Sequence, residues 1–434
     1  MVRVIGIRHE DKSRWETRVP LVPADIRDLI QHHGIQFRVQ TSPTRVFKDA
    51  EFTATGAAVG ANLDDCSFVL GVKEIPAAKF LPGQGYIFFS HTTKGQAYNM
   101  PMLHRLMELK CHLIDYERIV DAQGRRLVFF GRFAGLAGMI DTLWALGQRW
   151  RHEGIDNPLI GVQQAYHYKN LEHAKTEIAK IGEGIAREGL PQACVPLVCG
   201  FAGYGHVSLG AQEIYDLLPV KEVAPEDIAS IPRSANVCYK VVFYERHMVE
   251  RVDSSRPFDL QEYYKQPERY RGRFSAYVPH LTVMVNGIYW EPKYPRLITN
   301  DVLRELYERS ERPRLRLIGD VSCDIQGSVE CTVRATEPDN PVFVYEPRTG
   351  HVRDGVAGDG PVVLAIDHLP CELPVDSSVY FSRTLRPFVP ALANMDFGAP
   401  LDRCGLPPEL VKATILYHGE LTEPYRHLER FVVV

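Results

Sequence analysis

The sequence predicts an α/β protein of two domains, each built on a largely parallel sheet, with a ligand-binding cleft between the domains. The chain has 434 residues, which is enough for two or three domains at roughly 100–200 residues per domain. Apolar residues make up 45% and charged residues 24%, as in an ordinary globular protein. Short apolar runs alternate with segments whose apolar residues recur at helical spacing, the pattern of an α/β sheet protein.

Composition and charge limit the partners and the compartment. The 50 basic and 54 acidic side chains nearly cancel at a net charge of −4, so no overall field favours nucleic acid or an anionic membrane. No apolar run approaches the ~20 residues of a membrane helix, and no signal peptide is readable at the N-terminus. The nine cysteines include no C-x-x-C pair, which indicates a reducing compartment and no metal site. We therefore expect a cytoplasmic enzyme that acts on small-molecule substrates. The sequence leaves its oligomeric state undetermined.

The first third of the chain alternates strands with helices. Apolar runs predict strands at residues 2–7, 37–40, 68–72, 86–90 and 112–116. Helical spacing predicts helices at residues 24–33 and 100–110.

The middle and last thirds predict a second α/β domain. A long helix leaves the first domain, because Leu136, Ile140, Leu143, Gly147 and Trp150 recur at helical spacing, and a second helix follows over residues 170–188. A strand, a glycine turn and a helix through Leu218 come next, and residues 245–279 form an Arg-, Tyr- and Pro-rich elaboration. Further strands are predicted at residues 237–244, 281–289, 315–321 and 362–366.

The glycine turn is a candidate dinucleotide site formed by Gly203, Gly205, Ser208 and Gly210. The first glycine allows a tight turn, and the second lets the backbone approach a pyrophosphate at a helix N-terminus. Ser208 stands where glycine or alanine is usual, and it is small enough for close helix packing. A glycine-rich turn without a ligand is the alternative interpretation.

The residue that would read the ribose, about 20 positions further on, is ambiguous. Glu222, Glu226 and Asp227 all lie nearby, and Lys221 precedes them. The spacing therefore leaves the choice between NAD and NADP open.

Charged and polar residues follow several strands of the first domain. They occupy residues 8–23, 71–76, 89–94 and 114–117. The first segment by itself could be a solvated loop. The other three segments make this less favourable, because each of them also lies at the end of a predicted strand, and α/β proteins build their sites at that end of the sheet. Lysine and histidine at that edge favour catalysis.

These segments resemble a known family. The charged run from Arg8 to Arg18, the segments 71–76, 89–94 and 115–117, and residues 124–135 resemble the alanine dehydrogenase/transhydrogenase-like N-terminal domain of saccharopine dehydrogenases. The whole chain is similar to the lysine–ketoglutarate reductase domain of that family. The similarity continues through the glycine turn and through residues 286–290, 320–330 and 366–374 in family order.

The resemblance implies two Rossmann-like domains. Residues 1–135 with 372–434 would form an alanine-dehydrogenase-like substrate domain, and residues 136–371 a Rossmann dinucleotide-binding domain. In the family the C-terminal segment returns to the first domain.

The resemblance also implies a reaction and a set of site residues. The reaction joins the ε-amine of lysine to the keto carbon of 2-oxoglutarate and reduces the imine to saccharopine, or runs in reverse. Lys73 and His91 would be the acid–base pair, and Asp367 would lie near the nicotinamide. The implied substrate-binding residues, which hold carboxylates and amino groups, are Arg18, Glu16, Lys94, Glu117 and, more weakly, Arg126.

Each of these assignments has a structural alternative. Arg18 or Glu117 would otherwise form an interdomain salt bridge, and Asp367 would otherwise be a turn or capping residue. We expect NADPH as cofactor and the reductive direction, with NADH and the reverse direction open. The sequence ends at Val434 without the second dehydrogenase that many eukaryotic relatives carry, so the glutamate-forming step is expected in another protein.

Two other functions remain. One is an opine- or alanine-dehydrogenase-like enzyme that acts on another amino acid. The other is a non-catalytic nucleotide-binding regulatory protein, which the presence of both Lys73 and His91 disfavours.

Overall fold

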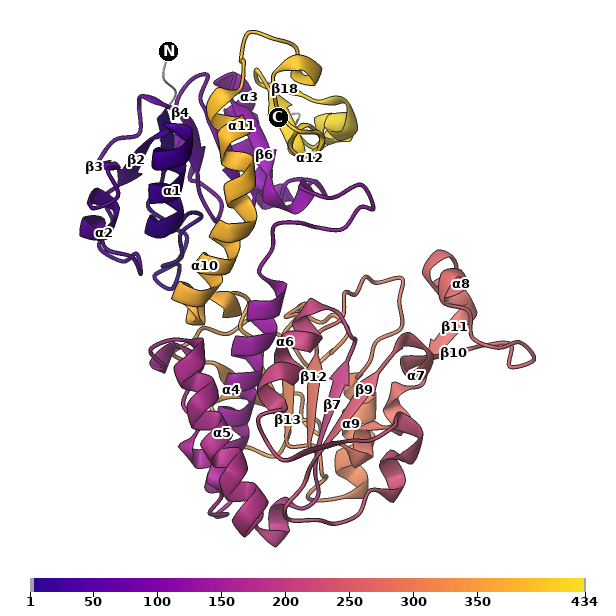
Figure 1. The fold of residues 1–434 in the computed structure, drawn as a ribbon. Helices are drawn as coiled ribbons and strands as arrows, with labels where there is room; N and C mark the ends of the chain where they lie inside the picture. The colour runs from indigo at the N-terminus through magenta and orange to yellow at the C-terminus, as the bar shows by residue number, and fades with distance from the viewer. Residues whose placement is uncertain (1–3, 433–434) are drawn as a thin grey trace. The chain divides into compact units, whose positions relative to one another are not determined.

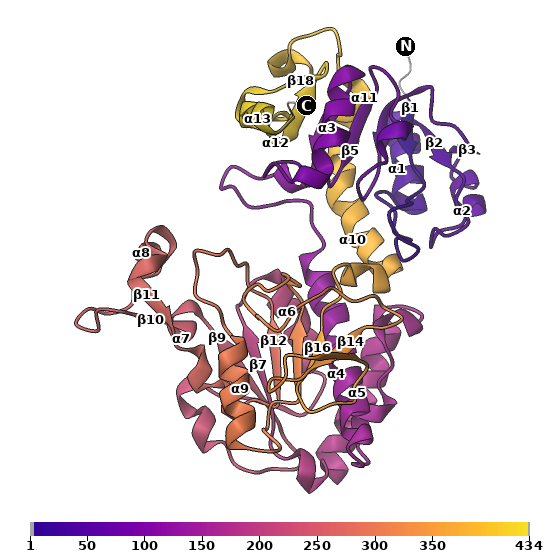
Figure 2. The same ribbon diagram turned by 180° about the vertical axis from the view of Figure 1, so that it is seen from behind.

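The computed structural model describes residues 4–432, which form two compact units. Unit 1 combines the chain up to Phe130 with the segment from Pro374 onward, and unit 2 is Gly131–Leu373 (Figure 1 and Figure 2). Each unit has its own sheet and its own buried core.

Unit 1 contains an eight-stranded sheet in the order β18-β17-β6-β5-β4-β1-β2-β3. The strands from β3 to β6 are parallel to one another, and β17 and β18 add an antiparallel edge. The strands are β1 (Val4–Ile7), β2 (Gln36–Gln40), β3 (Ala58–Gly60), β4 (Cys66–Leu70), β5 (Gly85–Phe88), β6 (His112–Asp115), β17 (Thr414–Tyr417) and β18 (Glu420–Leu421).

The C-terminal segment completes unit 1. Ser378 Oγ accepts a hydrogen bond from Val19 N at 3.1 Å, and Ser382 Oγ accepts one from Val22 N at 3.0 Å. These bonds attach α10 to the loop before α1, and Figure 1 shows the two helices beside each other. The helices of unit 1 are α1 (Pro23–His33), α2 (Asp49–Thr53), α3 (Met100–Glu108), α10 (Pro374–Leu385), α11 (Val389–Asn394), α12 (Pro408–Ala413) and α13 (Glu429–Val432).

Unit 2 contains a second eight-stranded sheet in the order β15-β14-β16-β13-β12-β7-β9-β8. Six neighbouring strands pair in parallel, in the order β8, β9, β7, β12, β13 and β16. Beyond β16, β14 and β15 are added by antiparallel pairing. The strands are β7 (Leu197–Ala202), β8 (Val220–Glu222), β9 (Cys238–Phe243), β12 (Val283–Asn286), β13 (Leu317–Asp320), β14 (Val342–Tyr345), β15 (Val352–Asp354) and β16 (Val362–Leu364).

Small residues bring α4 and α6 of unit 2 into close contact. A Cβ atom on Gly135 would lie 1.9 Å from the carbonyl oxygen of Val207, and one on Gly210 would lie 2.1 Å from that of Arg132. Any larger side chain at either position would push the helices apart. The helices of unit 2 are α4 (Gly131–His152), α5 (Leu171–Glu188), α6 (His206–Tyr215), α7 (Glu245–Met248), α8 (Leu260–Lys265) and α9 (Asn300–Arg309).

An arm extends from the body of unit 2 in both views (Figure 1 and Figure 2). It consists of the antiparallel pair β10 (Val249–Arg251) and β11 (Tyr270–Gly272) together with α8. Val249, Tyr263 and Tyr270 form a small apolar core of its own. The arm accounts for most of the predicted elaboration at residues 245–279.

The predicted α/β class with two largely parallel sheets is confirmed, whereas the cleft between the domains stays a prediction. Residues 2 and 3 of the first predicted strand lie outside the described residues. The helix predicted through Leu218 ends at Tyr215, and the strand predicted over 281–289 ends at Asn286. No helix within residues 4–432 is long and apolar enough to cross a membrane.

Candidate active site

Lys73 and His91 of unit 1 follow neighbouring parallel strands at the same sheet edge. Lys73 comes three residues after β4, and His91 comes three residues after β5. Because β4 and β5 pair in parallel, their carboxyl ends meet at this edge. The positive charge of Lys73 acts on His91, and no described residue forms an ion pair with the Lys73 ammonium.

Glu74 fixes the orientation and the protonation of His91. Its Oε1 atom lies 2.8 Å from His91 Nδ1, and Glu74 is buried. Burial opposes charge on both groups, but the hydrogen bond and attraction between them outweigh it. The pKa of Glu74 is therefore lowered to about 2 and the pKa of His91 is raised. This pairing holds the proton on Nδ1 and leaves Nε2 to exchange a proton with a substrate.

The backbone at His91 is held in an unusual conformation. His91 has a φ of 48°, in the left-handed region that non-glycine residues seldom adopt. Asn99 Nδ2 donates to the carbonyl oxygens of Ser90 and His91, at 3.0 and 3.2 Å. Asp115 accepts from Ser90 N at 3.1 Å, and its pKa is raised to about 6 because it is buried. Strain kept in place by several hydrogen bonds is typical of a functional site.

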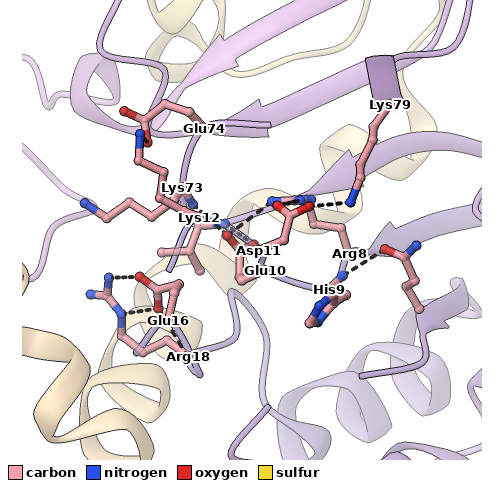
Figure 3. A network of polar contacts seen from close by, with 12 residues as sticks. Arg8, His9, Glu10, Asp11, Lys12, Glu16, Arg18, Lys73, Glu74 and Lys79 are labelled. Atoms are coloured by element: carbon pink, nitrogen blue, oxygen red, sulfur yellow. Dashed lines mark hydrogen bonds and ion pairs between the residues drawn. The ribbon is translucent and has the colours of Figure 1, made fainter. Parts of the chain in front are cut away.

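Glu10 ties the loop after β1 to the loop after β4. Its carboxylate accepts hydrogen bonds from Val72 N at 2.8 Å and Lys73 N at 3.0 Å. Burial raises its pKa to about 7, although the nearby Arg8 guanidinium opposes that shift. Glu10 therefore fixes the backbone from which the Lys73 side chain leaves (Figure 3).

Glu16 and Arg18 form a second buried ion pair at this edge. Arg18 Nε donates to Glu16 Oε1 at 2.8 Å, and both side chains are almost fully buried. The guanidinium lies 4.1 Å from the ring centre of Phe130. Figure 3 shows the pair of Glu16 and Arg18. A guanidinium that is held on one side by a carboxylate and packed on an aromatic ring has a fixed orientation, which suits recognition of a carboxylate.

The other predicted substrate-binding residues of unit 1 are more exposed. Arg126 forms an ion pair with Glu117 at 3.2 Å, and its side chain is 52% exposed. Lys94 is exposed, and its backbone N donates to Gln96 Oε1. Glu117 N donates to Asp115 Oδ1 at 2.7 Å, which ties Glu117 to the buried carboxylate beside Ser90.

The glycine turn of unit 2 has the shape of a phosphate cradle. Gly203 follows β7 with a φ of 91°, and a Cβ atom on Gly205 would meet no atom within 4 Å. Gly205 precedes α6, whose first backbone N–H groups are available to an anion. Ser208 is buried and accepts from Gln212 Nε2, and Gly210 serves the contact with α4. The first two glycines therefore suit a pyrophosphate, while the last two positions serve helix packing.

In the sheet, β7 lies between β12 and β9. The strand β8, which follows the glycine turn and α6 in the sequence, lies one position further out, beyond β9. Glu222, at the end of β8, forms an ion pair with Lys240 at 3.2 Å. The charged residues that follow β9 are Glu245 and Arg246, and Glu245 lines a cavity of about 490 Å³ that Gly203 and Gly205 also line. These residues occupy the position from which a Rossmann domain reads the ribose.

Glu245 is already hydrogen-bonded, whereas Arg246 is not paired with an acid. Glu245 Oε1 accepts from Tyr264 Oη at 2.7 Å and from Tyr204 Oη at 3.4 Å. Arg246 Nε donates to His247 Nε2, and no described residue forms an ion pair with it. Arg246 is therefore available to an additional negative charge on a ligand.

The rest of this sheet edge carries a network of hydrogen bonds centred on Asn286. Asn286 Nδ2, at the end of β12, lies 2.8 Å from each of Asp320 Oδ1 at the end of β13 and Ser322 Oγ and Ser328 Oγ in the segment that follows β13. Burial raises the pKa of Asp320. Asp367 is exposed beyond β16, three strands from β7, which is about 14 Å across a sheet.

Sequence reasoning assigned no role to several residues that hold this geometry. Glu74, Glu10 and Asp115 lie inside the motifs that were noted, but a motif does not reveal which carboxylate faces which base. Glu245 and Arg246 were missed because the spacing after the glycine turn pointed to β8. Only the strand order shows that β9 adjoins β7.

Two units with parallel sheets, one with acid–base groups and the other with a glycine turn, define a dehydrogenase fold of the alanine dehydrogenase type. Residues 6–137 match the model of the alanine dehydrogenase/PNT N-terminal domain. A solved structure of an L-alanine dehydrogenase is similar with a TM-score of 0.64 at 16% identity, over 99% of this chain and 100% of that chain. This likeness establishes the fold.

Curated relatives narrow the family. The chain is 37% identical to an alpha-aminoadipic semialdehyde synthase of Arabidopsis thaliana, over 98% of this chain and 41% of the relative. A Bos taurus relative, a mitochondrial alpha-aminoadipic semialdehyde synthase, is 33% identical over 98% and 48%. A saccharopine dehydrogenase [NAD(+), L-lysine-forming] of Emericella nidulans is 28% identical over 88% and 90%. The chain thus spans less than half the length of the first two relatives, and its resemblance to the saccharopine dehydrogenase family is confirmed.

Proposed function

We propose that this protein is a lysine–ketoglutarate reductase, which forms saccharopine. L-lysine, 2-oxoglutarate, NADPH and a proton would give saccharopine, NADP⁺ and water. The substrate classes follow from the names of the relatives, which refer to saccharopine, lysine and alpha-aminoadipic semialdehyde. Unit 1 would bind the two substrates, and unit 2 would bind the dinucleotide.

The pairing of His91 with Glu74 beside the Lys73 ammonium is the observation that carries this proposal. Condensation of an amine with a ketone needs a base to deprotonate the amine and an acid to release water from the carbinolamine. A histidine with a raised pKa and an adjacent lysine supply both kinds of group near neutral pH. A protein that only bound nucleotide would have no need of this pair.

The proton steps assign separate roles to the two catalytic residues. Lys73 would first release its own proton and would then accept one from the ε-ammonium of the substrate lysine, whose nitrogen attacks the keto carbon of 2-oxoglutarate. His91 Nε2 would give its proton to the hydroxyl of the carbinolamine, which leaves as water and produces a protonated imine. Glu74 acts as a positioning residue, because it stabilises the imidazolium form of His91.

The carboxylates of the substrates require fixed cations. We propose Arg18 as the principal one, because its guanidinium is buried, held by Glu16 and packed on Phe130. Lys94 and Arg126 are proposed as secondary contacts, and Glu117 as a partner for the lysine amino group. Their exposure supports a smaller contribution from each.

We propose NADPH as the cofactor, with its pyrophosphate at Gly203 and Gly205. The bound nicotinamide supplies a hydride to the imine carbon. The unpaired guanidinium of Arg246 supports recognition of a 2′-phosphate, because Glu245 is occupied by two tyrosine hydroxyls. Ser208 and Gly210 keep α6 close to α4, and Asp367 remains a proposed contact on the nicotinamide side.

The test is oxidation of NADPH by the purified full chain. Turnover should require both 2-oxoglutarate and lysine, and replacement of lysine by ornithine, alanine or ammonia should lower it by at least about tenfold. Turnover with ammonia and a 2-oxo acid would instead indicate an alanine-dehydrogenase-like enzyme. Tight NADPH binding without turnover on any amine would indicate a regulatory nucleotide-binding protein.

We retain the cytoplasm as the proposed compartment. All nine cysteines are free and buried, which supports a reducing environment.

A further inference from the structure

A basic basin lies in unit 2 at the amino ends of the parallel strands, whereas the glycine turn lies at their carboxyl ends. It has a volume of about 950 Å³, and its lining includes the residues that immediately precede β7, β12 and β13. The glycine turn follows the other end of β7, a strand of six residues that spans about 20 Å. The basin is therefore separate from the proposed dinucleotide site.

Five arginines line the basin, and only one acidic residue does. Arg316 is paired with Glu153 at 3.4 Å, and Arg309 is paired with Glu305 at 3.2 Å. No described residue forms an ion pair with the remaining three, which are Arg233, Arg312 and Arg314.

Two of the unpaired arginines repel each other. Partial burial lowers the pKa of Arg314, whose side chain is otherwise exposed, and the charge of Arg233 lowers it further. The Arg314 guanidinium nevertheless stays charged near neutral pH, because arginine does not deprotonate in proteins. A bound anion would relieve this repulsion, and a planar guanidinium matches phosphate geometry with two parallel hydrogen bonds.

Beside the arginines the basin has an apolar wall. Val195 comes from the segment before β7, Val278 from the segment before β12, and Val302 and Leu306 from α9. A simple inorganic anion would leave this surface and most of the volume unused. A ligand with a run of phosphates at one end and an aromatic base at the other would use both, and the volume is within the range of small-molecule sites.

We propose that this basin binds a nucleoside polyphosphate, with the phosphates on Arg233, Arg312 and Arg314 and the base against the apolar wall. The proposal does not depend on the reaction proposed above. It gives unit 2 two nucleotide sites at opposite edges of one sheet.

The experiment is titration calorimetry of the full chain with magnesium-free ATP at physiological salt, in the presence of saturating NADPH. The wild type should bind ATP, and R312Q/R314Q should bind it at least about tenfold more weakly. The matched control is R187Q, which changes an exposed arginine of unit 2 that pairs with Glu188 on α5. This control should bind ATP like the wild type, and all three proteins should have similar melting temperatures because the replaced side chains are exposed.

Several outcomes would overturn the proposal. Absence of ATP binding by the wild type, equal binding by R312Q/R314Q, or displacement of ATP by NADPH would each do so. Pyrophosphate and adenosine are titrated separately, because each represents one part of ATP. Binding of pyrophosphate as tight as that of ATP would contradict recognition of the base, and binding of adenosine as tight as that of ATP would contradict recognition by the arginines.

Discussion

The carboxyl edges of the two sheets differ in chemistry although both sheets are mainly parallel. The edge of unit 1 carries charged groups in contact with one another, including the pairs Glu74–His91 and Glu16–Arg18. At the edge of unit 2, glycines and the hydrogen bonds of Asn286 predominate, and the charged Glu245 and Arg246 form no ion pair among the described residues. The same topology therefore supports two kinds of site.

The proposed function places proton transfer in unit 1 and cofactor binding in unit 2, in keeping with this difference. Buried charges shift pKa values, which acid–base chemistry requires, and glycines allow the backbone to approach a phosphate. Substitutions at the edge of unit 1 should thus alter kcat and pH dependence. Substitutions at the edge of unit 2 should alter dinucleotide affinity.

The largest expected effect on kcat follows from removal of either member of the proposed acid–base pair. Lys73→Met and His91→Gln should each lower kcat by about 10²–10⁴-fold, because each removes a group that moves a proton. Fluorescence titration with NADPH should give an unchanged Kd for both variants. An equal loss of NADPH affinity would break the division between the two units.

Next in size is replacement of the buried substrate cation. Arg18→Lys should raise the KM for 2-oxoglutarate or lysine by about 10²-fold, because lysine cannot keep the bidentate bond to Glu16. The matched change Arg126→Lys, at an exposed position, should raise either KM less than about fivefold. Steady-state kinetics measures both, and similar values for the two variants would contradict a principal role for Arg18.

Removal of the carboxylate beside His91 should have an intermediate effect. Because Glu74 raises the pKa of His91, Glu74→Gln should lower that pKa. The imidazolium then disappears at a lower pH, so the basic limb of the kcat profile should move to lower pH, and kcat should fall by about 10- to 50-fold near neutral pH. A profile of kcat against pH is the measurement. Loss of activity without movement of the limb would reduce Glu74 to a structural role.

The smallest of the expected effects concerns unit 2 and tests its proposed role in dinucleotide binding. Arg246→Gln should raise the KM for NADPH by about tenfold and leave the KM for NADH unchanged, because only NADPH carries a 2′-phosphate. Its kcat should stay close to that of the wild type. Equal effects on both dinucleotides would remove Arg246 from 2′-phosphate recognition.

The sequence predicted much of the fold, because long apolar runs and helical periodicity are local signals. It missed β3, β8, β10, β11, β14, β15, β17 and β18. Most of these are short edge strands, and β8 has only three residues, so their pairing depends on contacts with distant segments. The helix predicted to Leu218 ends early because nothing in the apolar pattern marks the turn after Tyr215.

The candidate site was predicted unevenly for the same reason. Strand ends located Lys73 and His91 at one edge, but the pairing of His91 with Glu74 depends on how two loops meet in space. Gly210 fits a phosphate motif in the sequence, yet its position is dictated by a carbonyl oxygen of α4. Spacing along the chain could not identify Arg246, since the order of β8 and β9 in the sheet differs from their order in the sequence.

The most direct test of the central claim is the mass of the product formed from lysine and 2-oxoglutarate with NADPH that carries deuterium at the transferred position. A lysine–ketoglutarate reductase should form one product, which contains all the atoms of both substrates except one water, plus one deuterium and one proton. Deuterium found in glutamate or another simple amino acid, with no product that joins the two substrates, would rule out the proposed reductase activity.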